Sequence, residues 1–380
     1  MLIKKAQGCF IEDELENKLI DTSMGSGAQI IGHGNELAVR ASDQIKEGSV
    51  FSIPNPYTEE VSSLLKNHFN PGLSEKYVFC NSGTEANMRA CRLARAFTRR
   101  DMIARFHGGW HGGINGFLAD HPDNAGVPKL EYDLVKILPY NDEKCFDMID
   151  ENLAAVIVEP VQGSNPRSDI KEFLNELKIR CNKNGTLLIL DEVMTGFRLS
   201  MRGGAEIFDI DPDIITYGKV LGGGFPIGAV GAKSHVMKTQ NVFYGGTFSA
   251  NPLSMFAAKM ILETIIDKKL IQYDYLQESG IFLRQSLNQF FKEENISLQV
   301  MGCGPLNRII FTDRFIRNRK ERDEFEKQDQ AHFYQNLKNL GVFINSNRLI
   351  HISMCHTKDV IDQIVEKIKI ASLDYNKSNE

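Results

Sequence analysis

The sequence lacks any apolar run close to the roughly 20 residues needed to cross a bilayer. Its N-terminus carries two lysines, but no uninterrupted apolar stretch follows them, so we expect no signal peptide. The net charge of −5 is small and negative, which argues against nucleic-acid partners and anionic membrane surfaces. No internal repeat or low-complexity tract is visible. These absences favour a cytoplasmic globular protein.

The seven cysteines are scattered, and no CxxC pair occurs among them. This pattern excludes the usual disulfide frameworks and zinc sites, and it is typical of a reducing compartment. We therefore expect no bound metal. A single nucleophilic cysteine of low pKa stays open as an alternative.

What is present is an alternation of helical patterns and short apolar runs. The spacing of small and apolar residues predicts helices over 82–99 and 169–185, the second ended by a glycine. Several of the apolar runs are hydrophobic on both faces, which suits a parallel sheet covered on each side. The predicted strands are 102–106, 135–140, 154–160, 186–192 and 213–218.

The pattern changes at about residue 252, where two long helices are predicted in succession. Short strands, a charged helical stretch over 318–340 and a last helix follow, as in a small α+β domain. We expect an α/β fold whose large domain spans 41–274. The small domain would span 275–380, with residues 1–40 packed alongside.

Four groups of polar or aromatic residues follow predicted strands. In an open parallel sheet, ligands bind outside the carboxyl ends of the strands, so these groups are expected to share one crevice. Three of them are Ser82-Gly83-Thr84, Trp110-His111 and Asp191. The fourth is Lys219, which follows an apolar run and precedes the glycine-rich loop "VLGGGFPIGA".

Two of these groups have an ordinary structural explanation beside a functional one. Ser82, Gly83 and Thr84 stand where a helix begins, so they could bind a phosphate or simply cap the helix together with Glu85. Asp191 ends a buried strand, where a carboxylate needs a cationic partner. That partner could be the protonated pyridine nitrogen of a cofactor or a structural basic residue.

Trp110 and Thr247 also allow both a structural and a functional interpretation. Trp110 is the only tryptophan and lies in a glycine-flanked loop, so its ring could stack on a planar ligand or pack in the core. Thr247 lies in "YGGTFSANPLS", before a helix, where it could meet an anion or serve as an ordinary helix entry.

Lys219 connects these groups chemically. An amine in a desolvated pocket loses part of its charge and becomes a nucleophile toward aldehydes. A Schiff base with an aromatic aldehyde would use Lys219, with the ring nitrogen facing Asp191 and a phosphate facing Gly83 and Thr84. The loop lacks the GxGxxG spacing of a dinucleotide site.

At these residues the chain resembles the class III aminotransferases, which depend on pyridoxal 5'-phosphate and have the fold type I architecture. Within that family it looks most like the branch that contains glutamate-1-semialdehyde 2,1-aminomutase. The resemblance is carried by "NSGTEAN", "WHG", "VIVEPV", "LLILDEVMTGFR", "GKVLGGGFPIGA", "GGTFSANPLSM" and "CHTKDV", in family order over about residues 20–370. It implies a large domain with a mixed, mostly parallel sheet flanked by helices, and a smaller α+β domain.

The resemblance also implies roles for individual residues. Lys219 would form the Schiff base and shuttle the proton, and Asp191 would hold the pyridine nitrogen protonated. Thr247 would reach the phosphate of the neighbouring subunit, so the active unit would be a homodimer with shared sites. The remaining residues implied to hold the cofactor are Ser82, Gly83, Thr84, Trp110, His111, Glu159, Ser164 and Val193.

The leading functional hypothesis is an aminotransferase that moves an amino group from a small-molecule donor to a ketone or aldehyde acceptor through pyridoxamine phosphate. The alternative is a glutamate-1-semialdehyde aminomutase, which transfers the amino group within one molecule for tetrapyrrole synthesis. His351 stands at about the place where another class III branch has a carboxylate-binding arginine, and segment 345–351 is shorter than in the aminomutase. These differences favour the aminotransferase. A protein that binds the cofactor without turnover is the third possibility.

Overall fold

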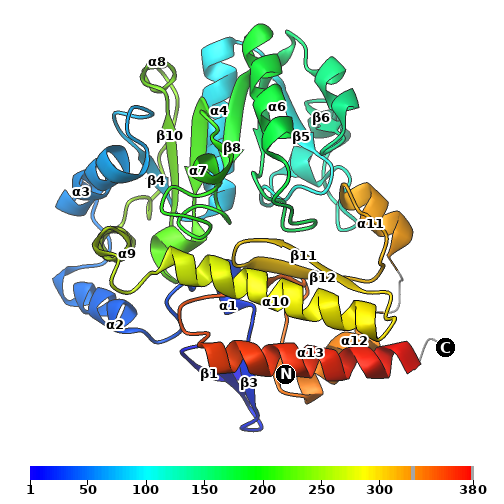
Figure 1. Cartoon of the computed structure of the whole chain (residues 1–380). Coiled ribbons are helices and arrows are strands. Elements are labelled where there is room, and N and C mark those ends of the chain that lie inside the picture. The colour runs from blue at the N-terminus through cyan, green and yellow to red at the C-terminus, as the bar shows by residue number, and fades with distance from the viewer. Residues whose placement is uncertain (327–329, 378–380) are drawn as a thin grey trace. The chain divides into compact units, whose positions relative to one another are not determined.

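The computed structural model describes residues 1–326 and 330–377 (Figure 1). The chain divides into two compact units. The first unit comprises residues 1–36, residues 163–168 and the described part of 268–380, and the second comprises 37–162 and 169–267. The domain limits expected from the sequence, 41–274 and 275–380, differ from the limits of these units and stay a prediction.

The second unit is built around one seven-stranded sheet of order β4-β10-β9-β8-β7-β5-β6. Strand β10 is antiparallel to both of its neighbours, and the pairs from β9 to β6 are all parallel. The predicted mixed, mostly parallel sheet is therefore confirmed. Its strands are β4 (Val78–Cys80), β5 (Met102–Phe106), β6 (Val135–Leu138), β7 (Leu153–Val158), β8 (Leu187–Asp191), β9 (Ile214–Tyr217) and β10 (Gly228–Ala232).

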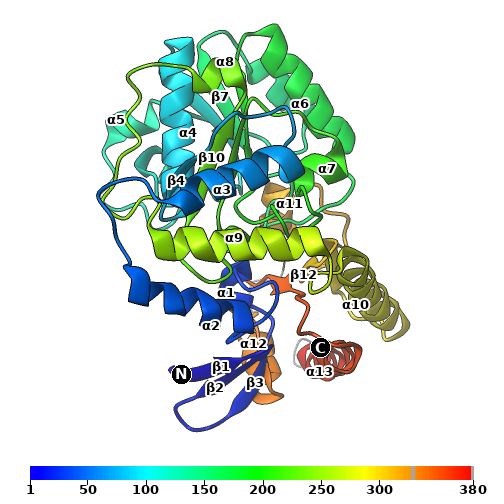
Figure 2. The same cartoon turned by 90° about the vertical axis from the view of Figure 1, so that its left-hand side faces the viewer.

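Helices cover both faces of this sheet, which explains why β7, β8 and β9 are buried along their whole length. Helices α4 (Gly83–Thr98) and α6 (Lys171–Lys183) lie on opposite sides of the sheet (Figures 1 and 2). Both were predicted from their apolar spacing. The other helices of this unit are α2 (Glu36–Asp43), which begins at the last residue of the first unit, α3 (Pro56–Leu64), α5 (Lys129–Tyr132), α7 (Gly204–Phe208), α8 (Ser234–Met237) and α9 (Pro252–Asp267).

Short helical turns complete the second unit. Their bounds are η1 (Gln44–Glu47), η2 (Leu65–Phe69), η3 (Asn115–Leu118), η4 (Glu143–Met148) and η5 (Lys219–Gly222).

The first unit contains two small sheets, of order β1-β2-β3-β13 and β11-β12-β14. The predicted charged helix over 318–340 is two helices, α11 and α12, and residues 327–329 of that stretch lie outside the described residues. The strands are β1 (Ile3–Gln7), β2 (Phe10–Asp13), β3 (Lys18–Asp21), β11 (Gln299–Cys303), β12 (Leu306–Ile310), β13 (Val342–Phe343) and β14 (Ile350–His351). The helices are α1 (Met24–Gly27), α10 (Tyr273–Glu293), α11 (Arg319–Phe325), α12 (Ala331–Asn339) and α13 (Lys358–Lys377).

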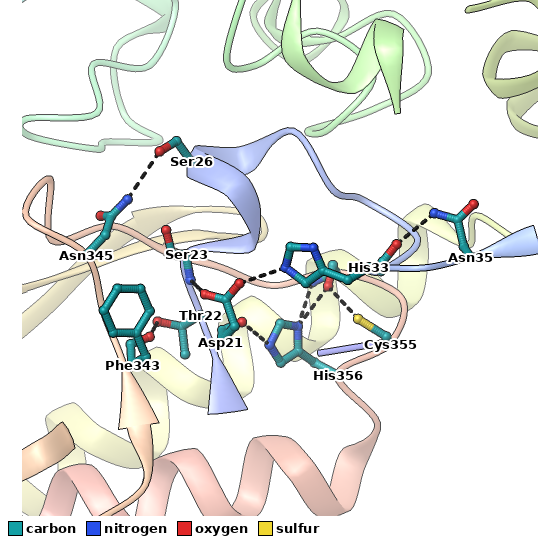
Figure 3. Close-up of polar contacts among 12 residues, drawn as sticks. Asp21, Thr22, Ser23, Ser26, His33, Asn35, Phe343, Asn345, Cys355 and His356 are labelled. Atoms are coloured by element: carbon teal, nitrogen blue, oxygen red, sulfur yellow. Dashed lines mark hydrogen bonds and ion pairs between the residues drawn. The ribbon is translucent and has the colours of Figure 1, made fainter. Parts of the chain in front are cut away.

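A buried polar network ties the N-terminal strands of this unit to its C-terminal segment (Figure 3). Oδ2 of Asp21 lies 2.8 Å from Nε2 of His33, and the backbone oxygen of Asp21 lies 3.1 Å from Nε2 of His356. Nδ1 of His356 in turn lies 2.9 Å from the hydroxyl of Ser353. Asp21 and His356 are 335 positions apart in the sequence. Their contact therefore joins the end of β3 to the loop that follows β14.

The described residues contain no membrane-spanning helix, no metal-binding cluster and no disulfide bond. No helix among them is long and apolar enough for a membrane span. Within residues 1–326 and 330–377, no group of three or more acidic, histidine or cysteine side chains is placed to hold a metal ion. All seven cysteines are free thiols.

Candidate active site

A cavity in the second unit lies at the carboxyl ends of the central strands. It collects residues that follow β5, β7, β8 and β9 together with the first turn of α4, as expected for ligand sites in open parallel sheets. Its lining residues are Gly83, Thr84, Asn87, Trp110, His111, Gly112, Glu159, Asp191, Val193, Met194 and Lys219. Eight of the eleven residues predicted from the sequence are therefore brought together here: Gly83, Thr84, Trp110, His111, Glu159, Asp191, Val193 and Lys219.

Asp191 is the last residue of β8 and is buried. Its Oδ2 lies 2.7 Å from Nδ1 of His111, and the same oxygen accepts a hydrogen bond from Nδ2 of Asn87 at 2.7 Å. Its Oδ1 accepts a hydrogen bond from the backbone N–H of Val193 at 3.0 Å. Three contacts therefore fix the orientation of this carboxylate, which lines the cavity. Among residues 1–326 and 330–377, no arginine or lysine forms a salt bridge with it.

The next residue, Glu192, points the other way because side chains alternate along a strand. Its carboxylate accepts hydrogen bonds from the hydroxyl of Thr195 and from the backbone N–H groups of Gly204 and Ala205, at the start of α7. Burial raises the pKa of Glu192 to about 7. Only Asp191 of this adjacent pair is thus available to a ligand.

Asn87 lies on the first turns of α4 and was not assigned a role from the sequence. Its amide nitrogen bonds both Asp191 and the backbone oxygen of His111, and its Oδ1 accepts from the hydroxyl of Thr216 at 2.7 Å. These bonds hold Asp191 and His111 in place from one side. Helical spacing was the available signal, since Asn87 follows Gly83 by four residues and so shares its face.

Lys219 begins η5, two residues after the last residue of β9. Its φ of 44° lies in the left-handed region, an uncommon and strained conformation for a residue with a long side chain. Burial lowers the pKa of Lys219, and nearby Arg198 adds to the effect, while Glu159 and Asp191 oppose it. A lowered pKa makes the neutral, nucleophilic amine more available.

Glu159 follows β7, and its side chain is also buried. Its Oε2 accepts a hydrogen bond from the backbone N–H of Trp110 at 2.9 Å, which anchors the loop after β5. Burial raises the pKa of Glu159 to about 7, and neighbouring Asp191 also raises it, while His111 and Lys219 oppose the shift. The ring of Trp110 is 53% exposed, so it is not a core side chain.

Glycines bring the backbone close to the cavity at the start of α4. A Cβ on Gly83 would lie 2.6 Å from Cγ1 of Val193, and a Cβ on Gly112 would lie 2.2 Å from Oγ1 of Thr84. Gly112 also has a φ of +91°, which side chains disfavour. The first N–H groups of a helix have no partner within it and attract anions, so this tight turn suits a phosphate.

The residues present fit pyridoxal 5'-phosphate. An oriented carboxylate can meet the pyridine nitrogen, a lysine of lowered pKa can meet the aldehyde, and a helix N-terminus can meet the phosphate. The hydroxyl of Thr84 adds a further donor, and the half-exposed ring of Trp110 can stack on a planar ligand.

Three predicted residues do not line this cavity. Ser82 caps α4, its hydroxyl accepting from the backbone N–H of Glu85 at 3.1 Å. Ser164 belongs to the first unit, where its backbone oxygen accepts from Arg322. Thr247 is exposed in the loop between α8 and α9. Their contributions to cofactor binding stay predictions. Asn87, Gly112 and Met194 line the cavity without having been predicted.

Comparison with known proteins gives consistent matches over nearly the whole chain. The chain is 35% identical over 392 residues to a glutamate-1-semialdehyde 2,1-aminomutase of Hydrogenobaculum, covering 98% of this chain and 92% of the relative. Among solved structures, an omega-transaminase from Sphaerobacter thermophilus matches with a TM-score of 0.90 at 27% identity, covering 99% of this chain and 91% of the other. A β-phenylalanine aminotransferase from Variovorax paradoxus matches with a TM-score of 0.89 at 28% identity, covering 99% and 88%.

The model of one protein family matches residues 1–371. That match confirms the resemblance seen in the sequence motifs, and with it the dependence on pyridoxal 5'-phosphate. The chain belongs to the class III aminotransferase family.

Proposed function

We propose that this protein transfers an amino group from a small-molecule donor to a ketone or aldehyde acceptor, with Lys219 as the residue that bonds the cofactor. The observation that carries the proposal is that Lys219 and Asp191 line one cavity, where burial lowers the pKa of the lysine. Membership of the class III aminotransferase family supports the same chemistry.

Bound pyridoxal 5'-phosphate supplies an aldehyde carbon that exchanges amino groups and a protonated ring that withdraws electrons from the reacting carbon. Asp191 accepts the hydrogen bond of the ring nitrogen and keeps its proton in place. His111 and Asn87 orient that carboxylate. The ε-amine of Lys219 would accept and return a proton at the reacting carbon.

The surrounding residues hold the ring and the phosphate. Val193 and Trp110 line the cavity and would hold the cofactor ring between them, which would keep water from the reacting face. Gly83 and Thr84 receive the phosphate at the start of α4. Glu159 holds the loop that carries Trp110 through the N–H of that residue.

A second candidate is intramolecular transfer, as in an aminomutase. It is favoured by the curated relatives, because those named glutamate-1-semialdehyde 2,1-aminomutase share 31–35% identity with this chain. The altered segment 345–351 and His351 favour the two-substrate reaction instead.

The experiment that separates them uses single substrates. The cofactor-loaded enzyme is incubated with an amino donor alone, and the conversion of its visible absorbance to that of pyridoxamine phosphate is followed together with release of the keto product. A parallel sample receives glutamate-1-semialdehyde alone. Conversion with the donor supports the aminotransferase, whereas 5-aminolevulinate formed without a second substrate supports the aminomutase. Failure of both reactions across a broad donor panel would contradict catalysis.

We also propose a cytoplasmic homodimer in which Thr247 contributes to the neighbouring subunit's phosphate site. Seven free cysteines support a reducing compartment. The exposure of Thr247, Phe243 and Phe248 in one loop supports a contact made outside the single chain. Equilibrium sedimentation of wild type and Thr247→Ala, with cofactor affinity measured on both, tests this arrangement.

A further inference from the structure

The middle strand of the β11-β12-β14 sheet carries a buried arginine, Arg308, that is only 6% exposed. Asn307 directly precedes Arg308 in β12, and its side chain accepts a hydrogen bond from Arg284 of α10. Helix α10 therefore lies on the face of the sheet to which Asn307 points. Side chains alternate along a strand, so Arg308 stands on the opposite face.

The guanidinium of Arg308 is poorly satisfied. Its Nη1 donates a hydrogen bond to the backbone oxygen of Asn347 at 2.7 Å, and this is its one hydrogen bond within the described part of the chain. Its Nε is buried without a partner, and among residues 1–326 and 330–377 no carboxylate forms an ion pair with it. Burying an unpaired charge is costly, so such groups usually have a partner.

The groups around Arg308 are mostly basic or phenolic. Arg322 of α11 and Tyr334 of α12 lie within electrostatic range of it, and the guanidinium of Arg348 lies 4.9 Å from the ring centre of Tyr334. The hydroxyl of Tyr334 is itself buried without a partner. Burial and the nearby Arg322 lower the pKa of Arg308 to about 10, so it stays charged at neutral pH.

In the described part of the chain, the acid that acts electrostatically on Arg308 is Glu326, and its carboxylate already has other partners. Glu326 lies 3.2 Å from Nε of Arg322, and its other oxygen accepts from the backbone N–H of Phe311. Arg322 also pairs with Asp323 at 2.8 Å. Glu326 therefore offsets part of the local positive charge but leaves Arg308 without a direct hydrogen-bonded anion.

The unused edge of Arg308 has a specific shape. With Nη1 engaged, Nε and Nη2 form the side of the guanidinium that donates two parallel hydrogen bonds to an oxyanion. We propose that Arg308, assisted by the hydroxyl of Tyr334, binds an oxyanion group, a carboxylate or a phosphate, of a small molecule. Arg308 and Tyr334 belong to the first unit, whereas the residues that line the cavity around Lys219 all belong to the second.

A direct test follows the Nε–H signal of Arg308 by nuclear magnetic resonance on the cofactor-loaded enzyme labelled with ¹⁵N-arginine. The signal is assigned by its loss in Arg308→Lys. Inorganic phosphate and succinate are titrated separately. We expect a saturable downfield shift of this signal with one probe, and the probe that saturates at lower concentration identifies the oxyanion. The signal of Arg319, whose Nε is paired with Asp323, should not move. An unmoved Arg308 signal with both probes would overturn the proposal.

Thermal unfolding gives a second, independent measurement. Arg308→Met removes an unpaired buried charge, so without added anion we expect its Tm to equal or exceed that of wild type. The rise in Tm that the effective probe causes in wild type should be lost in Arg308→Met and reduced in Tyr334→Phe, but kept in the surface variant Arg319→Met. An equal rise in wild type and Arg308→Met would show that Arg308 has only a structural role.

The result does not depend on the proposed catalytic chemistry. Lys219→Ala should keep the response of the Arg308 signal to the probe, because the proposed oxyanion site does not use Lys219. Loss of amino transfer in Lys219→Ala together with an intact Arg308 response would support both proposals separately.

Discussion

Nδ1 of His111 lies 2.7 Å from Oδ2 of Asp191, and both side chains are buried at the carboxyl end of the central sheet. Asn87 donates to the same oxygen. The other ring nitrogen of His111 is buried without a partner among the described residues. This arrangement makes His111 a positioning residue for the carboxylate that we propose holds the proton on the ring nitrogen of the cofactor.

Replacing His111 should therefore weaken catalysis without removing the cofactor. In His111→Phe, the charged carboxylate of Asp191 loses one hydrogen-bond partner, an interaction worth about 1.5–3 kcal/mol, and we expect kcat to fall roughly 10- to 100-fold. The pH dependence of the cofactor's visible absorbance should shift in the same variant. His121→Gln, on the loop beside Trp110, is the matched control and should keep both properties. A normal kcat with an unshifted absorbance profile would contradict the positioning role.

Asp191 and Glu192 are adjacent carboxylates, and we expect their replacement to change kcat by different amounts. Asp191→Asn keeps the shape and the hydrogen bond from Val193 but removes the charge that holds the ring proton, so kcat should fall by about 100-fold or more. Glu192→Gln changes a group that faces α7, so its kcat should stay within a few-fold of wild type. Single-turnover kinetics on both variants checks the difference. Equal losses in the two variants would show that Asp191 has no special role.

Glu192 also predicts a dependence of stability on pH. Its pKa is raised to about 7 in the folded chain by burial, above its ordinary value near 4.5. The folded state therefore binds a proton that the unfolded state has lost between these two values, so stability should fall as pH rises through this window. The full effect is on the order of 3 kcal/mol. Urea unfolding at several pH values should show a flatter profile for Glu192→Gln, and an unchanged slope would argue against the raised pKa.

Gly112 and Gly113 offer a matched pair at the phosphate end of the cavity. In Gly112→Ala the new Cβ would meet the side chain of Thr84 at 2.2 Å in a backbone conformation that disfavours side chains. We expect cofactor affinity to fall about tenfold or more, because strain of this kind costs about 1–3 kcal/mol. Gly113→Ala has open space and should keep wild-type affinity. Cofactor titration by fluorescence measures both, and equal affinities would contradict the close approach.

The sequence was sufficient to predict the cavity residues that directly follow strands. Asp191, Lys219 and Trp110 each follow an apolar run, and parallel strands bring such positions to one edge. Helix α4 was predicted from a different local signal, the helical spacing of small and apolar residues over 82–99. Ser82 shows the limit of this reasoning, because a serine before a helix fits both a phosphate site and the cap that the structure contains.

Features that depend on distant partners could not be predicted in this way. Asn87 acts through hydrogen bonds to Thr216 and Asp191, which are far away in sequence. Strand β3 pairs with β13, whose residues come more than 300 positions later, and no local pattern identifies that pairing. Arg308 likewise reads as an ordinary surface charge until the strand that carries it is seen to be buried.

The central claim is that Lys219 bonds the cofactor covalently, and borohydride reduction tests it most directly. The cofactor-loaded protein is reduced, digested and analysed by mass spectrometry. The account predicts one modified peptide, with the pyridoxyl group on Lys219, and none in Lys219→Ala. Modification of another lysine, or an unmodified Lys219 in protein that has bound the cofactor, would contradict it.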